Sequence, residues 1–174
     1  GSGNKAEYCI LLTTFYCLLT PIRIPTLYRT AIEQLLAEVL GVSRILWLNH
    51  GYLAGDDTDS HIDTLARFCA PDHICYVACP DVADEHYSAF AAMEEELQEF
   101  RQADGSPYKL TPLPWPDAIY DEEGERMPAT YANFLIINDA VLLPVYDVPQ
   151  DEDTIAVRKE LFPDREVVPI DCQP

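Results

Sequence analysis

Hydrophobic and polar positions along the chain follow a pattern that occurs three times. In each occurrence, two short runs rich in β-branched and aromatic residues precede a segment with helical spacing of apolar residues, and a further such run follows. The order strand, strand, helix, strand predicts an α+β fold of three ββαβ units. We place the units at about residues 6–49, 60–114 and 130–171 of a single domain covering residues 1–174.

The expected strands are bounded by turn-forming residues. The strand pairs ahead of the helices are predicted at residues 8–12 with 15–19, 61–68 with 73–79, and 131–137 with 140–146. The strands after the helices are predicted at 44–48, 108–113 and 166–168. Asn138-Asp139 separates the last pair as a two-residue hairpin turn does.

Three helices fill the intervals between these strands. The first is expected from Pro25 to Gly41, where glycine allows a left-handed stop, with an apolar face of Ile32, Leu35, Leu36, Val39 and Leu40. The second is expected from Asp81 or Asp84 to just before Asp104-Gly105, carrying Tyr87, Phe90, Ala91, Leu97 and Phe100. The third begins at the acidic turn 151–153 and ends at Pro163, carrying Ile155, Val157 and Leu161.

The amino-acid composition limits which kinds of partner the chain is expected to bind. The 174 residues are 48% hydrophobic, with a mean hydropathy of -0.08, as expected of one globular domain. Eleven basic against thirty acidic residues give a net charge of -19, which repels nucleic acid and anionic membranes and suits small cations. Without an apolar run of about 20 residues or a leader pattern, a cytoplasmic location is expected, and Gly1-Ser2-Gly3 resembles a cloning remnant.

Six cysteines, at positions 9, 17, 69, 75, 79 and 172, form no C-x-x-C pair. Most lie inside apolar runs, so we expect buried free thiols rather than disulfides or a metal site, and no cofactor. The stretch Asp56-Asp57-Thr58-Asp59 lacks the central glycine and terminal glutamate of a calcium-binding loop. A divalent ion there is a weak alternative.

His61 and Asp63 are the residues with the clearest chemistry. They lie two apart at the start of an expected strand, which would turn both side chains to the same face. A histidine beside a carboxylate can transfer protons, and the carboxylate can alternatively hold a guanidinium in a bidentate pair. An ordinary surface pair is the alternative that such a spacing always allows. The glycine-containing acidic loop before His61 favours a functional site.

Nearly the whole chain resembles one enzyme family, the agmatine deiminases and related bacterial peptidyl-arginine deiminases. The most specific block is Gly55-Asp56-Asp57-Thr58-Asp59-Ser60-His61-Ile62-Asp63, followed by Ala66-Arg67-Phe68. Further matching stretches are Leu12-Thr13-Thr14, Cys17-Leu18-Leu19, Trp47-Leu48, Pro128-Ala129-Thr130-Tyr131-Ala132-Asn133-Phe134 and Phe162-Pro163-Asp164-Arg165-Glu166-Val167-Val168.

This resemblance implies a fold and a reaction. Its members are five-bladed αβ-propellers of the pentein superfamily, so the chain would form a partial, three-unit propeller. The family hydrolyses a guanidine to a ureido group and ammonia through a covalent amidino-thioester on cysteine. By position, His61 would be the general acid and base, Asp63 would hold the guanidinium nitrogens, and Asp57 with its loop would line the site.

Departures from the family pattern shape the functional hypothesis. The family's nucleophilic cysteine belongs to a later Gly-rich His-Cys block, whereas this sequence ends at residues 171–174, and Cys172 lacks that motif. An acidic substrate ligand expected ahead of the first strand is replaced by residues 1–7, where Glu7 is a poor substitute. We therefore predict no enzymatic activity, and an engineered fragment acting as a scaffold or association module.

Two other interpretations stay open. One is a guanidine hydrolase, converting agmatine to N-carbamoylputrescine and ammonia, whose missing units come from another chain. The other is a weak binder of cationic guanidines that relies on Asp63 and the acidic field. The irregular, acidic and proline-rich loop 115–129 is long enough to serve as a lid over such a site.

An apolar segment indicates association. Where the family carries a polar, asparagine-rich run, residues 20–25 are mostly apolar, and further apolar residues lie close in sequence. As a group they form a possible interface: Phe15, Tyr16, Ile22, Ile24 and Tyr28.

We predict self-association or association with a complementary chain. Open strand edges and an exposed apolar segment favour a dimer or larger assembly. Light scattering over a range of protein concentrations measures this directly, and a monomer mass at every concentration would contradict it.

Overall fold

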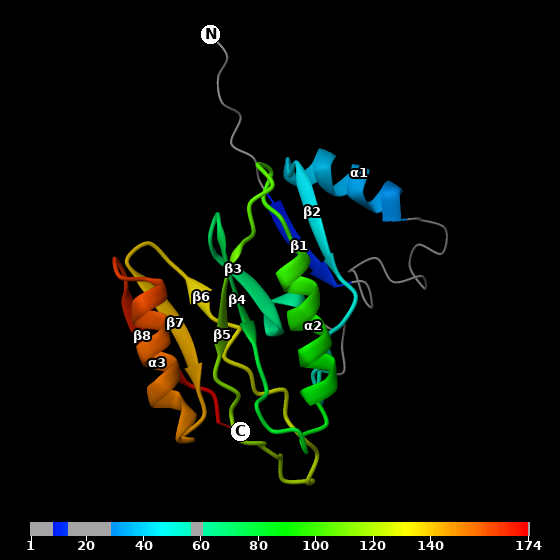
Figure 1. The fold of residues 1–174 in the computed structure, drawn as a ribbon. Coiled ribbons are helices and arrows are strands. Elements are labelled where there is room, and N and C mark those ends of the chain that lie inside the picture. The colour runs from blue at the N-terminus through cyan, green and yellow to red at the C-terminus, as the bar shows by residue number, and fades with distance from the viewer. Residues whose placement is uncertain (1–8, 14–28, 57–60, 174) are drawn as a thin grey trace.

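The structure is a computed structural model that describes residues 9–13, 29–56 and 61–173, with residues 9–13 described by their backbone alone. Three α-helices and eight strands follow one another along these residues (Figure 1). The helices are α1 (Arg29–Leu40), α2 (Tyr87–Glu99) and α3 (Gln150–Leu161), with a short 3-10 helix η1 (Ile62–Thr64). The strands are β1 (Cys9–Thr13), β2 (Arg44–Leu48), β3 (Ala66–Ala70), β4 (His73–Val77), β5 (Lys109–Leu113), β6 (Leu135–Ile136), β7 (Ala140–Val145) and β8 (Glu166–Asp171).

The fold is mixed α/β, with the described strands in three small sheets. β1 and β2 pair in parallel, and the other sheets have the orders β3-β4-β5 and β6-β7-β8. In each three-stranded sheet the first pair is antiparallel and the second is parallel, with the helix between the parallel strands. Among the described residues, the predicted order of strand, strand, helix and strand is therefore complete twice, and the first unit shows β1, α1 and β2, while its predicted strand at 15–19 lies outside the described residues. The arrangement of such units around a propeller axis, and their exact limits, stay predictions.

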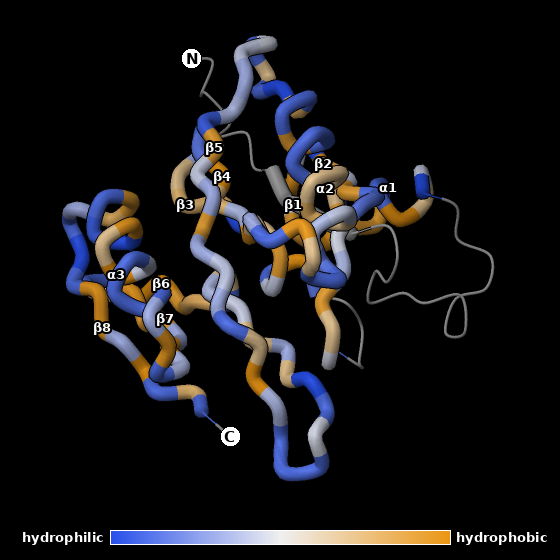
Figure 2. Tube along the Cα trace, turned by 60° about the horizontal axis from the view of Figure 1, so that its bottom comes forward, coloured by the Kyte–Doolittle hydropathy of each residue, from blue (hydrophilic) through white to orange (hydrophobic). Residues whose placement is uncertain are grey.

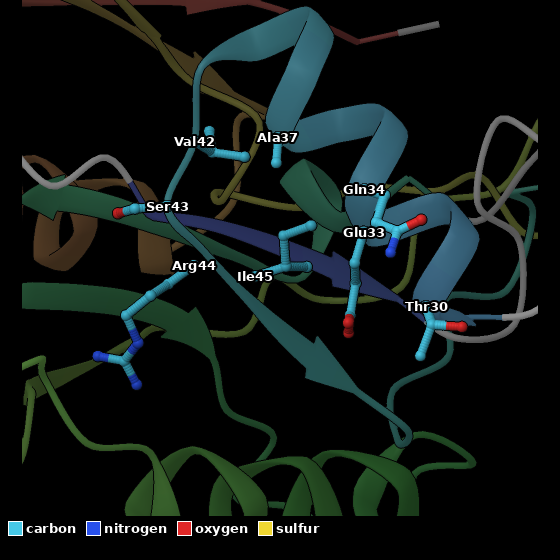
Figure 3. Close-up of a pocket in the computed structure, with 8 residues that line it drawn as sticks. All are labelled: Thr30, Glu33, Gln34, Ala37, Val42, Ser43, Arg44 and Ile45. Atoms are coloured by element: carbon cyan, nitrogen blue, oxygen red, sulfur yellow. The ribbon is translucent and has the colours of Figure 1, made fainter.

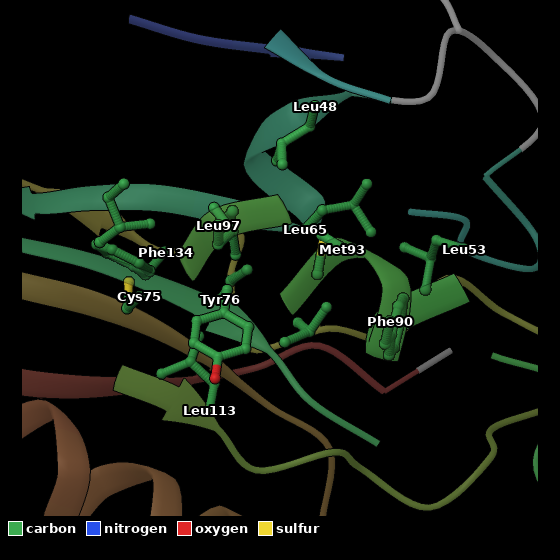
Figure 4. Packing of buried hydrophobic residues seen from close by; sticks show 14 of the residues in the cluster. Leu48, Leu53, Leu65, Cys75, Tyr76, Phe90, Met93, Leu97, Leu113 and Phe134 are labelled. Carbon is green, nitrogen blue, oxygen red and sulfur yellow. The ribbon is translucent and has the colours of Figure 1, made fainter. Parts of the chain in front are cut away.

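The main hydrophobic core lies between α2 and the central sheet. Phe90, Met93 and Leu97 recur on α2 at the spacing of one helical face and are all buried. They pack with Cys75 and Leu113 from the sheet in one cluster (Figure 4). Hydrophobic and hydrophilic positions alternate along the helices in Figure 2, as this one-sided burial requires. Among the described residues, no helix has the length and apolar character needed to cross a membrane.

Two predicted strands are only partly formed. The run 61–68 opens as the turn η1, and strand β3 begins only at Ala66, because the Thr64 N–H closes a tight turn on the His61 carbonyl at 3.1 Å. The prediction that His61 and Asp63 share one face of a strand is therefore wrong. The run 131–137 is a turn up to Phe134, and only Leu135–Ile136 pairs as a strand.

The helix boundaries are close to those predicted, but the predicted apolar faces of α1 and α3 are not the buried ones. Gly41 ends α1 with a φ of 68° and donates to the Ala37 carbonyl at 3.0 Å, as expected of a glycine stop. The apolar face of α1 is not covered by the described residues, since no α1 residue is buried and Leu35, Val39 and Leu40 are exposed. The predicted beginning at Pro25 lies outside the described residues.

Helix α3 buries a cation instead of its aliphatic residues. Arg158 and Thr154 are fully buried, whereas Ile155, Val157 and Leu161 are only partly buried. The Arg158 guanidinium lies 3.7 Å from the centre of the Phe134 ring and donates to the Tyr131 carbonyl at 2.7 Å. This side chain connects α3 to the segment 131–134, which is not a strand.

Replacing Arg158 tests this role. Arg158→Ala should lower the free energy of unfolding by about 3 kcal/mol, because it leaves a cavity and an unpaired Tyr131 carbonyl. Urea denaturation provides the measurement. Lys159→Ala, at the exposed neighbouring position on α3, is the matched control and should change stability by less than about 0.5 kcal/mol. Equal losses in both variants would contradict a structural role for Arg158.

Candidate functional site

His61 and Asp63 lie together at the surface, on the turn that precedes β3. His61 occupies the position before η1 with an extended backbone, and Asp63 lies within η1. The distance between His61 Nδ1 and Asp63 Oδ1 is 3.9 Å, and the two side chains are 52% and 44% exposed. This is an ion-pair distance rather than a hydrogen bond. Both groups are close enough to act on one ligand and open enough to receive it.

The other predicted site residues fall outside the described residues. Asp57 lies in the segment 57–60 and the possible interface in the segment 14–28. Their roles stay predictions: Asp57 as a site-lining carboxylate, and an interface of Phe15, Tyr16, Ile22, Ile24 and Tyr28.

A carboxylate that sequence reasoning missed organises the loop leading to this site. Asp84 Oδ1 accepts hydrogen bonds from the backbone N–H of His86 at 2.9 Å and from His86 Nδ1 at 2.6 Å. Asp84 Oδ2 accepts from Trp115 Nε1 at 3.3 Å and Arg126 Nη2 at 3.1 Å. Burial alone would raise the pKa of Asp84, but these donors outweigh it and hold that pKa well below its usual value.

His86 connects the Asp84 carboxylate to the loop 52–56. It is fully buried, and its Nε2 accepts the backbone N–H of Ala54 at 2.9 Å. Since Nε2 is an acceptor, the proton of a neutral imidazole must lie on Nδ1, facing Asp84. The ring is stacked on Tyr52 and lies 4.9 Å from the ring of Trp115. His86 therefore fixes the backbone three residues before Asp57.

The loop 115–129 packs directly against the same backbone. Gly55 has a φ of 81°, and a Cβ there would lie 2.2 Å from the carbonyl oxygen of Arg126. Arg126 also pairs with Glu85 at 2.9 Å, in addition to Asp84. Arg126 therefore holds the loop 115–129, the predicted lid, against Gly55 and the carboxylates of Asp84 and Glu85. The sequence signal for this cluster was the pair Asp84 and His86, two residues apart, with Trp115 and Arg126 in the loop.

A second carboxylate holds the other end of this segment. Glu96 on α2 accepts the backbone N–H groups of Asn49 at 2.8 Å and His50 at 3.2 Å, and also the Asn49 side-chain amide. Residues 49–56 are therefore fixed at both ends by side chains from the α2 region.

A hollow in the described part of the chain lies away from His61 and Asp63. A cavity of about 450 Å³ opens between α1 and β2 (Figure 3). Its lining residues are Thr30, Glu33, Gln34, Ala37, Val42, Ser43, Arg44 and Ile45. None of them belongs to the predicted site, and Glu33 is already bound to Trp47 Nε1 at 2.7 Å. Within residues 29–56 and 61–173, no three His, Cys, Asp or Glu side chains gather as metal ligands.

The described thiols are free, as predicted, but not uniformly buried. Cys75 and Cys79 are buried, Cys69 is partly buried, and Cys172 is exposed, which corrects the expectation for that residue. A hydrogen bond with Cys69 lowers the pKa of Cys75 and Arg158 lowers it further, although burial opposes both. The same hydrogen bond and burial raise the pKa of Cys69.

Comparison with known proteins identifies the family. The family model of Porphyromonas-type peptidyl-arginine deiminase matches residues 6–174. An agmatine deiminase of Pseudomonas fluorescens is 34% identical over 91% of this chain and 47% of its own length. The chain belongs to this deiminase family, and it spans about half the length of the curated relatives it matches.

Solved structures agree in fold as well as in sequence. A Cys-to-Ser variant of the C. jejuni agmatine deiminase with substrate bound has a TM-score of 0.85 and 39% identity, over 95% of this chain and 47% of that one. The agmatine deiminase of Enterococcus faecalis has a TM-score of 0.80 and 29% identity, over 95% and 49%.

These relatives correct one prediction. The expectation that the chain is not an enzyme is wrong, because the matched relatives are named as agmatine deiminases and the match extends over 91–97% of this chain. The expectation rested on a motif absent from the printed sequence, whereas the residues present align with an enzyme family throughout. The hypothesis of an engineered origin stays a prediction.

The Asp84 cluster generates a pH prediction. Since the pKa of Asp84 is lower in the folded protein than in the unfolded chain, the unfolded chain takes up the proton first as pH falls. The stability that Asp84 contributes is present above about pH 5 and is lost progressively below it. Asp84→Asn should therefore be less stable than wild type at pH 7, with a difference that shrinks toward pH 3.

Urea denaturation at several pH values between 7 and 3 measures this difference. Asp164→Asn, which replaces an exposed carboxylate after α3, is the control and should follow the wild-type profile. A constant difference between Asp84→Asn and wild type at all pH values would contradict the electrostatic role of Asp84.

Proposed function

We propose that this chain provides the acid–base and guanidinium-binding groups of a guanidine hydrolase. The observation that carries the proposal is the placement of His61 and Asp63 within 3.9 Å of each other on an exposed turn. The names of the relatives point to agmatine or peptidyl-arginine as the substrate class. The net charge of -19 favours encounter with such cations.

The two residues suit different parts of the reaction. A carboxylate matches two N–H groups of the planar guanidinium, so Asp63 orients the substrate. His61 can then donate a proton to one departing nitrogen and later accept one from water. Because both residues lie on one short turn, a guanidinium bound to Asp63 would have its central carbon beside the His61 imidazole.

The reaction balances with a thiolate as nucleophile. The thiolate adds to the guanidinium carbon, the carbon–nitrogen bond breaks, and ammonia leaves with a proton from the His61 imidazolium. Water then gives a proton to His61 and adds to the same carbon, and the carbon–sulfur bond breaks. The products are a ureido compound, ammonium and the regenerated thiolate.

We assign the thiolate to a part of the enzyme outside the described residues. Cys75 and Cys79 are enclosed in the core, and the raised pKa of Cys69 disfavours its thiolate. Cys172 is exposed but lacks the His-Cys block that carries the family's nucleophile. Further units of one αβ-propeller, in the same polypeptide or in a second chain, would bring the thiol to the exposed face of His61 and Asp63. In this proposal the further units would cover the exposed side chains of His61 and Asp63 and so close the site.

Guanidinium binding tests the proposal on this chain directly. Agmatine should shift the NMR signals of the His61 ring saturably, and N-acetyl-arginine amide should do the same if peptidyl-arginine is also a substrate. Asp63→Asn should weaken binding about tenfold, because the charge-assisted pair with the guanidinium is lost. Asp164→Asn, on an exposed carboxylate after α3, should bind as the wild type does.

The uncharged ureido compound N-carbamoylputrescine serves as the ligand control and should bind more weakly, since its ureido group cannot form the ion pair. Absence of any agmatine-dependent change at His61 in the wild type would contradict the proposal. Equal binding by wild type and Asp63→Asn would contradict the role of Asp63.

A further inference from the structure

The backbone that carries His61 is held by a buried hydroxyl. Thr64 is 9% exposed, and its Oγ1 donates to the His61 carbonyl at 2.6 Å. The Thr64 backbone N–H donates to the same carbonyl at 3.1 Å. Two donors from one residue therefore fix the peptide that follows His61. The His61 side chain makes no hydrogen bond that caps η1.

A second buried hydroxyl holds Thr64 in turn. Thr130 is 2% exposed, and its Oγ1 donates to the Thr64 carbonyl at 2.7 Å while accepting the Ala132 N–H at 3.1 Å. Thr130 follows the loop 115–129 and is 66 residues from Thr64 in sequence. The turn that bears His61 and Asp63 is thereby joined to a distant segment by the hydrogen bond from the Thr130 hydroxyl to the Thr64 carbonyl.

Thr130 is fixed by the C-terminal sheet. Its backbone N–H donates to Tyr146 Oη at 3.0 Å, and the Tyr146 hydroxyl donates to the Thr130 carbonyl at 2.9 Å. The Tyr146 backbone N–H donates to the Asp151 carboxylate at the start of α3. Burial raises the pKa of Tyr146 to about 12, so its hydroxyl keeps its proton at neutral pH and stays a donor.

We propose that Thr64 and Thr130 are positioning residues that set the orientation of His61 and Asp63 for guanidinium recognition. This inference rests on the proposed function, and neither threonine touches the ligand. The geometry favours it because the side chains of His61 and Asp63 are about half exposed and 3.9 Å apart, so packing around them is incomplete and the backbone of the turn sets their relative position. Buried hydrogen bonds face no competition from water, and small displacements of reacting groups are costly.

Paired substitutions separate the hydroxyl from the shape of each side chain. Thr64→Val and Thr130→Val keep the volume and remove the donor, whereas Thr64→Ser and Thr130→Ser keep the donor and remove a methyl group. We expect each valine variant to bind agmatine about fivefold more weakly, at a temperature where all variants are folded. Each serine variant should bind within about twofold of wild type. Agmatine affinity from the His61 ring signals is the measurement.

Thr154→Val is the matched control. Thr154 is fully buried on α3, and its hydroxyl donates to the Gln150 carbonyl at 2.9 Å, so the variant loses an equivalent hydrogen bond away from the site. It should lower the melting temperature as the other valine variants do but leave agmatine affinity unchanged. If Thr154→Val weakens binding as much as Thr64→Val, or if the serine variants bind as poorly as the valine variants, the inference is overturned.

Amide hydrogen exchange keeps this test independent of ligand binding. The Thr64 and Leu65 amides donate within the turn, at 3.1 and 3.0 Å. Without any ligand, their exchange should be at least about fivefold faster in Thr64→Val and Thr130→Val than in the serine variants. A wild type that does not bind agmatine would remove the proposed function, while the exchange rates would still show whether the hydroxyls hold the turn. Unchanged amide exchange in both valine variants would overturn this inference and leave the proposed function untouched.

Discussion

The buried guanidinium of Arg158 is the constraint on which the C-terminal half of the structure depends. A charge with no exposed surface needs partners in the interior, and Arg158 finds them in the Tyr131 carbonyl, the Phe134 ring and the Cys75 thiol. These partners come from the turn 131–134 and from β4 in the central sheet. One helix, one turn and one strand must therefore be in place together before the two terminal nitrogens of the guanidinium have their partners, and its Nε, among the described atoms, has none. The turn then continues directly from Ala129 and Thr130, next to the site.

The regular elements were largely predictable, because local patterns specify them. The alternating runs gave β2, β4, β5, β7 and β8 within a few residues, and Gly41 ended α1 as its position suggested. The hairpin at Asn138-Asp139 is present as well, with the Ile137 N–H bound to the Ala140 carbonyl at 2.9 Å. Each of these features depends on neighbours within a few residues, which is the range that periodicity can detect.

The errors arose where distant residues decide the local conformation. His61 and Asp63 looked like alternating strand positions, but the Thr64 hydroxyl and N–H draw the chain into a turn. Aliphatic residues marked the expected face of α3, yet the interior accepted Arg158 because partners 27 and 83 residues away in sequence could pair with it. The Asp84, His86 and Arg126 cluster was missed for the same reason. The spacing of His61 and Asp63, together with the family resemblance, singled out this pair, and the structure places His61 Nδ1 3.9 Å from Asp63 Oδ1, while their functional role stays a prediction.

The hydroxyl contacts around the turn have a consequence for how such a site can change over evolutionary time. Thr64 and Thr130 bind backbone carbonyls, which every amino acid possesses, rather than particular side chains. The side chains at positions 61 and 63 can therefore be exchanged without removing the backbone acceptors of these hydrogen bonds, whereas Ile62 packs against the core. Selection can alter which compound is recognised by changing the exposed side chains, while two small buried residues preserve the frame. In this region of the chain, ligand preference can change while the backbone structure is kept.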